Sequence, residues 1–112
     1  MRFEFRDVVL VPFPFTNQIT SKQRPAVVIS SRAYGEAKPD IILMAITSKL
    51  HPGQLSFGDV ELTEWQLAGL LKPSAVKPVM ATLEQSLVIK QLGQLSLTDE
   101  TALRQTIRVL VG

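Results

Sequence analysis

The sequence contains no cysteine and a single histidine, His51, among its 112 residues. Without cysteine the chain can form neither a disulfide framework nor a metal site built on thiolates. One histidine excludes a histidine-rich metal centre, and it excludes a nuclease site that uses two histidines from one chain. We therefore expect no metal ion and no other cofactor.

Long apolar runs are also missing, and none approaches the roughly 18 residues of a membrane-spanning helix. Charged residues (Glu4, Arg6 and Asp7) precede the first apolar stretch, unlike in a secretory signal peptide. Hydrophobic residues make up 46% of the chain and charged residues 20%, as in folded globular proteins. The sequence thus predicts one cytoplasmic domain over residues 1–112, with no membrane partner.

The net charge is only +2, so the chain is not a bulk polycation. Its distribution is uneven, because residues 1–50 carry seven basic and four acidic side chains. A mildly basic N-terminal half suits a compact anionic ligand.

Short apolar, partly β-branched segments separated by proline, glycine and polar residues predict strands. They cover residues 8–11, 25–31, 40–47, 57–62 and 74–83, with a short extended piece at 92–96. Pro78 is expected to interrupt the fifth strand. Residues 34–40 are typical of a connection, marked by Gly35 and Pro39. Residues 63–69, with Thr63 as N-cap, and part of 84–91 favour short helical turns.

The clearest helix is the last element. Thr98 is a plausible N-cap, followed by two acids that the helix dipole favours in a first turn. The apolar stripe of this helix consists of Leu103, Ile107, Leu110 and Val111. Many short strands followed by one helix predict a mainly β fold, with a small, strongly curved antiparallel sheet and a packed C-terminal helix.

Arg24 and Thr47 are the main candidates for a functional site. Pro25 enforces an extended start of the second strand, so that Arg24 lies at the edge of a rigid element and can clamp a phosphate. Thr47, Ser48 and Lys49 place two hydroxyls and a cation at the end of the third strand. The simpler alternatives are a surface salt bridge for Arg24 and an ordinary turn after Thr47.

The ordered set of these motifs resembles the PemK/MazF family of toxin endoribonucleases. The motifs are Asp7-Val-Val-Leu-Val-Pro-Phe-Pro-Phe15, Arg24-Pro-Ala-Val-Val-Ile-Ser30, Ile46-Thr-Ser-Lys49 and Gly93-Gln-Leu-Ser96. The resemblance implies an SH3-like small barrel with a terminal helix, a homodimer, and metal-independent cleavage of single-stranded RNA. It implies a cognate antitoxin with a disordered acidic tail, and DNA binding by the antitoxin complex. It assigns catalysis to Arg24 and Thr47.

The chemistry supports these assignments. Attack of a ribose 2′-hydroxyl on the adjacent phosphate builds negative charge, and one well-aimed donor stabilises such charge by about 3–4 kcal/mol. Lys22, Ser48, Lys49 and Lys77 are expected to bind the RNA. Lys77 stands in a segment where many family members carry an acid and a later arginine, both missing here. Arginine stays protonated, so the general base remains unassigned.

Two other functions are compatible with the sequence. One is a toxin of the same fold that acts on a protein such as DNA gyrase, which needs no phosphate clamp. The other is an inactive SH3-like binding module in which Arg24 is structural. Phe13, Phe15, Trp65 and Leu67 are candidates for an apolar dimer interface or for the core.

Overall fold

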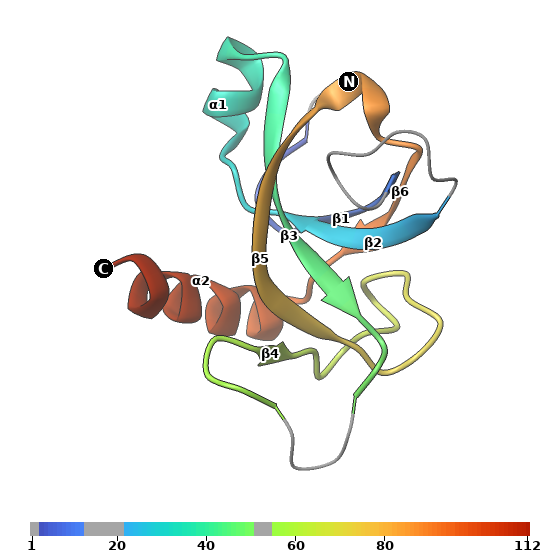
Figure 1. Ribbon diagram of the computed structural model, residues 1–112, viewed down its shortest axis with the longest axis vertical. Helices are drawn as coiled ribbons and strands as arrows, with labels where there is room; N and C mark the ends of the chain where they lie inside the picture. Colours follow the sequence, from blue (N-terminus) through green and yellow to red (C-terminus); the bar gives the residue numbers. More distant parts are fainter. Residues whose placement is uncertain (1–2, 13–21, 51–54) are drawn as a thin grey trace.

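The structure is a computed structural model that describes residues 3–12, 22–50 and 55–112. Phe13, Phe15 and His51 lie outside these described residues. Figure 1 shows a bent sheet with one long helix packed across it. In chain order the elements are β1 (Asp7–Pro12), β2 (Gln23–Val28), α1 (Arg32–Ala37), β3 (Asp40–Thr47), β4 (Val60–Glu61), β5 (Ala75–Glu84), the short 3₁₀ helix η1 (Gln85–Leu87), β6 (Lys90–Gln94) and α2 (Leu97–Val111).

The six strands form one sheet in the order β4-β5-β3-β2-β1-β6, and every pairing in it is antiparallel. The sheet curls strongly, so that β5 bends along its length and β1 and β2 cross it steeply (Figure 1). This confirms the predicted curved antiparallel sheet with a C-terminal helix.

The central strands are apolar on both faces because each face is covered by a separate core cluster. Val8, Val27 and Met44 pack on the face under α2, together with Leu103. Their chain neighbours pack on the opposite face with Phe3, which the alternation of strand side chains requires. Continuous apolar runs such as residues 26–28 follow from this double coverage.

The terminal helix begins two residues earlier than the N-cap prediction implies, at Leu97. Ser96, not Thr98, caps α2, and its hydroxyl accepts a hydrogen bond from the Asp99 N–H at 3.1 Å. Ile107 and Leu110 pack against the core beside Leu103, as the stripe predicts. Val111 is 68% exposed, so its place in the stripe was wrong; the helix extends beyond the sheet there.

The connection predicted at 34–40 is largely helical. Residues 32–37 form α1, whose N-cap Ser31 accepts a hydrogen bond from the Tyr34 N–H. Gly35 suggested a turn, but it is buried in this helix, where a Cβ would lie 3.4 Å from the Phe3 carbonyl oxygen. Close packing, and not chain reversal, explains this glycine.

Two further predictions were only partly right. Residues 63–69 form irregular turns without a helix, and the Thr63 hydroxyl donates to the Asp99 carboxylate instead of capping. Pro78 does not end β5. The β3–β5 register shifts between Met44 and Ile46, however, and Pro78 lies in the segment of β5 opposite this shift. Proline lacks the N–H that a regular ladder needs, so the pairing accommodates it as an irregularity.

Candidate functional site

The candidate site lies where β2 and β3 part. Their ladder ends at the Ala26–Ala45 pair, although β2 continues to Gln23 and β3 to Thr47. Beyond that pair β2 stays bonded to β1, and β3 stays bonded to β5 through Thr47 and Ala75. We call this divergence the fork; Figure 1 shows the ends of the two strands pointing apart. Pro25 favours it because it cannot donate a hydrogen bond to β3.

A hollow of about 550 Å³ opens at the fork, and we call it the arginine hollow. Five of the six predicted site residues line it, namely Arg24, Thr47, Ser48, Lys49 and Lys77. No carboxylate lines it among the residues that the structure describes. The local charge therefore suits an anion.

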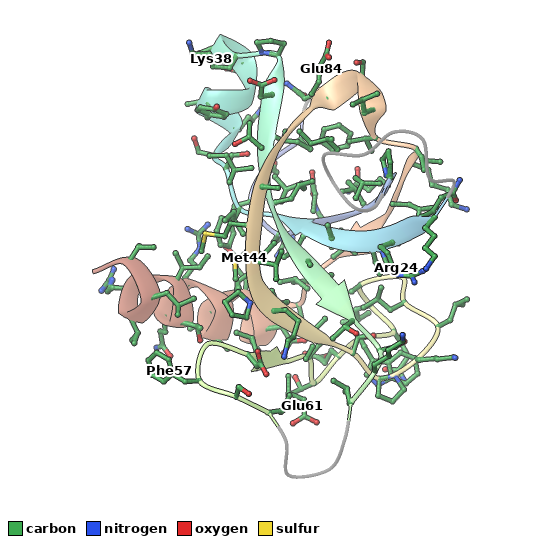
Figure 2. All side chains as sticks on the ribbon, viewed as in Figure 1. Arg24, Lys38, Met44, Phe57, Glu61 and Glu84 are labelled. Atoms are coloured by element: carbon green, nitrogen blue, oxygen red, sulfur yellow. The ribbon has the colours of Figure 1, made fainter. Side chains whose placement is uncertain are left out.

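Arg24 lies at the diverging end of β2 (Figure 2) and its side chain is exposed. Its Nη1 donates one long hydrogen bond, at 3.3 Å, to the neighbouring Gln23 carbonyl oxygen. Within the described part of the chain it forms no ion pair, so the predicted alternative of a structural salt bridge finds no partner there. Most of its five donors remain available to a ligand.

Thr47 is held in a defined orientation. Its Oγ1 accepts a hydrogen bond from the Lys49 N–H at 3.1 Å. A hydroxyl that already accepts still has its own proton to donate, and a phosphate oxygen entering the hollow is a suitable acceptor. Thr47 and Arg24 both line the arginine hollow, although their strands no longer pair there.

Lys77 is already engaged by a carboxylate. Its Nζ lies 2.8 Å from Asp59 Oδ2, which also accepts from the Ser56 N–H at 2.7 Å. The Asp59 side chain is 1% exposed and that of Lys77 is 36% exposed. Burial by itself raises the pKa of Asp59, but the hydrogen bonds from Lys77 and Ser56 and the charge of Lys77 outweigh it and lower the pKa.

The remaining predicted residues differ in their placement. Ser48 and Lys49 are exposed at the mouth of the arginine hollow, directly after β3. Lys22 is exposed just before β2 and does not line the hollow. Among residues 3–12, 22–50 and 55–112, no three acidic, histidine or cysteine side chains cluster as metal ligands do. No helix in this part of the chain is long and apolar enough to cross a bilayer.

The sequence model of one protein family spans nearly the whole chain. Its description is PemK-like, MazF-like toxin of type II toxin-antitoxin system, and it matches residues 4–111. The chain belongs to this family. A comparison with curated proteins found no match to this PemK/MazF-like toxin.

Solved structures share the fold of this PemK/MazF-like toxin. The Mycobacterium tuberculosis toxin MazF-mt6 is 20% identical with a TM-score of 0.71, covering 91% of this chain and 92% of that one. A MazE-MazF structure from Deinococcus radiodurans is 18% identical with a TM-score of 0.76, covering 100% and 97%. An endoribonuclease in complex with its cognate antitoxin, from Mycobacterial species, is 12% identical with a TM-score of 0.78, covering 98% and 95%.

One feature of the site in this PemK/MazF-like toxin was missed in the sequence. Asp59, which holds Lys77, is separated from it by 18 positions, and no local pattern connects the two. Trp65, a candidate for the dimer interface, packs partly buried against the core, whereas Leu67 is 61% exposed. Only the folded chain distinguishes these cases, because both residues stand in the same turn.

Proposed function

We propose that this PemK/MazF-like toxin is an endoribonuclease that cleaves single-stranded RNA without a metal ion. The observation that carries the proposal is the convergence of Arg24 and Thr47 on one basic hollow without acidic lining residues. In the reaction the ribose 2′-oxygen forms a bond to phosphorus and the bond to the 5′-oxygen breaks. One proton leaves the 2′-hydroxyl and one is delivered to the departing 5′-oxygen.

The residues divide this work according to their donors. The Arg24 guanidinium offers a planar pair of N–H groups to two phosphoryl oxygens, where charge develops in the transition state. The Thr47 hydroxyl, fixed through the Lys49 N–H, donates to a further oxygen. Ser48 and Lys49 hold the neighbouring backbone of the RNA. Lys77 adds charge at the wall of the hollow while Asp59 fixes its position.

The test is cleavage of a 5′-labelled single-stranded RNA by purified protein in the presence of a chelator. Arg24→Ala removes the guanidinium and Thr47→Val removes the hydroxyl, and we expect kcat to fall at least about 10²–10³-fold in each variant. Arg24→Lys keeps the charge but loses the planar pair of donors, so it restores little activity. Lys38→Ala is the matched control, because Lys38 is exposed at the end of α1, far from Arg24 (Figure 2).

Specific outcomes would contradict this mechanism. Cleavage that stops when chelator is added would show that a metal is required. Cleavage that persists when the nucleotide at the cut site carries no 2′-hydroxyl would exclude the 2′-oxygen as nucleophile. If the folded wild-type protein binds RNA without cutting it, the result would favour the inactive binding module. Inhibition of DNA gyrase without RNA cleavage would favour a toxin that acts on a protein.

The proposal includes two protein partners and a location. A cognate antitoxin with an acidic disordered tail would block the basic hollow. The solved endoribonuclease in complex with its cognate antitoxin is a precedent for such a partner. A second copy of the chain would cover exposed apolar side chains such as Phe57 and Val109, which are 78% and 62% exposed. Sedimentation of the purified toxin at micromolar concentration tests for the dimer. The proposed site of action is the cytoplasm, where messenger RNA is translated.

A further inference from the structure

We propose that the RNA continues from the arginine hollow, around the fork, into a second hollow that binds the nucleotides flanking the cleavage point. This inference rests on the proposed ribonuclease function. The second hollow has a volume of about 380 Å³ and is lined by Lys72 and Lys90 together with apolar side chains. We call it the lysine hollow.

The two hollows are continuous at the fork. Pro25 and Ser48 line both of them. Leu10 pairs with Pro25 on one side and with Lys90 on the other, so these three residues form one row across β2, β1 and β6 and share a face of the sheet. Arg24, next to Pro25, alternates to the other face. Since no β2–β3 pair closes the sheet beyond Ala26, the two hollows meet there at its end.

The charge of the lysine hollow matches that of the arginine hollow. Lys72 and Lys90 are both exposed, and neither forms an ion pair within the described part of the chain. No carboxylate lines this hollow among the described residues. Lys77 on β5 and Lys90 on β6 are separated by the strands β3, β2 and β1, and the space between β3 and β2 is widened at the fork. A strand with several phosphates therefore meets cations over its whole path.

The apolar wall gives the unpaired bases a surface to contact. Leu71 is 94% exposed, the highest value for a large apolar side chain in the part of the chain that the structure describes. The turn that carries Leu71 is held at both ends. Gly69 has a positive φ of +79° and packs closely against Leu92, and the Ser74 hydroxyl donates to the Lys72 carbonyl oxygen at 2.9 Å. Sites for single-stranded nucleic acid combine cations for the phosphates with a surface for the unpaired bases. In the lysine hollow this surface is aliphatic, so it offers the bases apolar contact without aromatic stacking.

The experiment compares a short RNA that just spans a mapped cut site with the same RNA extended on both sides. For the wild type we expect kcat/KM to be higher on the extended RNA. In Lys72→Ala/Lys90→Ala this length advantage disappears, whereas Lys38→Ala keeps it. Both lysines and Lys38 are exposed, so thermal unfolding of the three proteins should coincide.

Salt dependence separates the two components of the lysine hollow. Binding is measured with the extended RNA carrying a 2′-deoxyribose at the cut site, which prevents cleavage. When salt is raised from about 50 to 200 mM, the affinity for this RNA falls in both proteins. Because the double variant lacks two phosphate contacts, its affinity should fall by a factor about sevenfold smaller than that of the wild type. Leu71→Ser lowers the affinity for the extended RNA at every salt concentration and leaves the slope unchanged.

The outcomes distinguish this inference from the proposed function. If the wild type cuts no RNA at all, the proposed function fails and the inference fails with it. If the wild type cuts RNA and the double variant keeps both the length advantage and the salt slope, only the inference is overturned. It is also overturned if the double variant loses binding of a polyglutamate peptide but keeps the wild-type response to RNA length, because the hollow would then serve an acidic protein segment.

Discussion

Asp99 joins the terminal helix to the start of the turns over residues 63–69, and its removal gives the sharpest stability prediction. Asp99 is buried, with 1% of its surface exposed. Its Oδ1 accepts from the Thr63 N–H at 3.0 Å and from the Thr63 hydroxyl at 2.9 Å, and its Oδ2 accepts from the Glu64 N–H at 3.0 Å. Asp99→Ala removes all three acceptor contacts at once.

The expected loss follows from these contacts. A hydrogen bond to a charged group contributes about 1.5–3 kcal/mol, but the Thr63 hydroxyl can rotate towards water after the change. The two backbone N–H groups then account for most of the effect, so we expect the free energy of unfolding to fall by about 3 kcal/mol. For a chain of 112 residues this corresponds to a decrease in Tm of about 13 °C. Asp99→Asn keeps one acceptor but turns an amide donor towards the Glu64 N–H, and we expect about half the loss.

Urea unfolding followed by circular dichroism measures these values. With a slope of about 1.5 kcal/mol/M, the midpoint of Asp99→Ala should lie about 2 M below that of the wild type. Thr98→Ala is the control, because Thr98 is exposed and does not cap the helix; its effect should stay within about 0.5 kcal/mol. If Asp99→Ala and Thr98→Ala unfold within about 1 kcal/mol of each other, the carboxylate does not hold the turn and the reasoning is wrong.

Two further predictions concern close packing and acid stability. Gly93→Ala should destabilise the fold by about 3 kcal/mol, because its Cβ would lie 2.7 Å from the Ala68 backbone. Gly35→Ala, whose Cβ would have its nearest contact at 3.4 Å, should change the free energy of unfolding by less than about 1 kcal/mol. Thermal unfolding measures both, and equal effects of the two variants would contradict this prediction. Asp59, whose pKa is lowered in the folded state from 3.8, stabilises the fold at neutral pH and loses this contribution as the pH falls below that value. The difference in unfolding free energy between wild type and Asp59→Asn should therefore be constant near neutral pH and shrink in acid, and a difference that grows in acid would refute the role of Lys77.

Much of the fold could be predicted because the relevant signals are local. The third strand was predicted at 40–47 and observed at Asp40–Thr47, since an apolar run between Pro39 and a polar pair leaves few alternatives. The acidic first turn and the apolar stripe of α2 are likewise properties of neighbouring residues. The predictions for Gly35 and Thr98 were wrong because a glycine can serve packing as well as a turn, and because two hydroxyl residues competed for one cap.

The sequence by itself determined the strands, the terminal helix and the proximity in the chain of Arg24 to Pro25 and of Thr47 to Lys49, because these depend on side-chain periodicity and backbone restriction. Only the tertiary structure decided that β2 and β3 separate after Ala26 and that Asp59 holds Lys77. It alone brought Lys72 and Lys90 to the same end of the sheet. The register of a curved sheet depends on packing across both of its faces, and no short stretch of sequence contains that information.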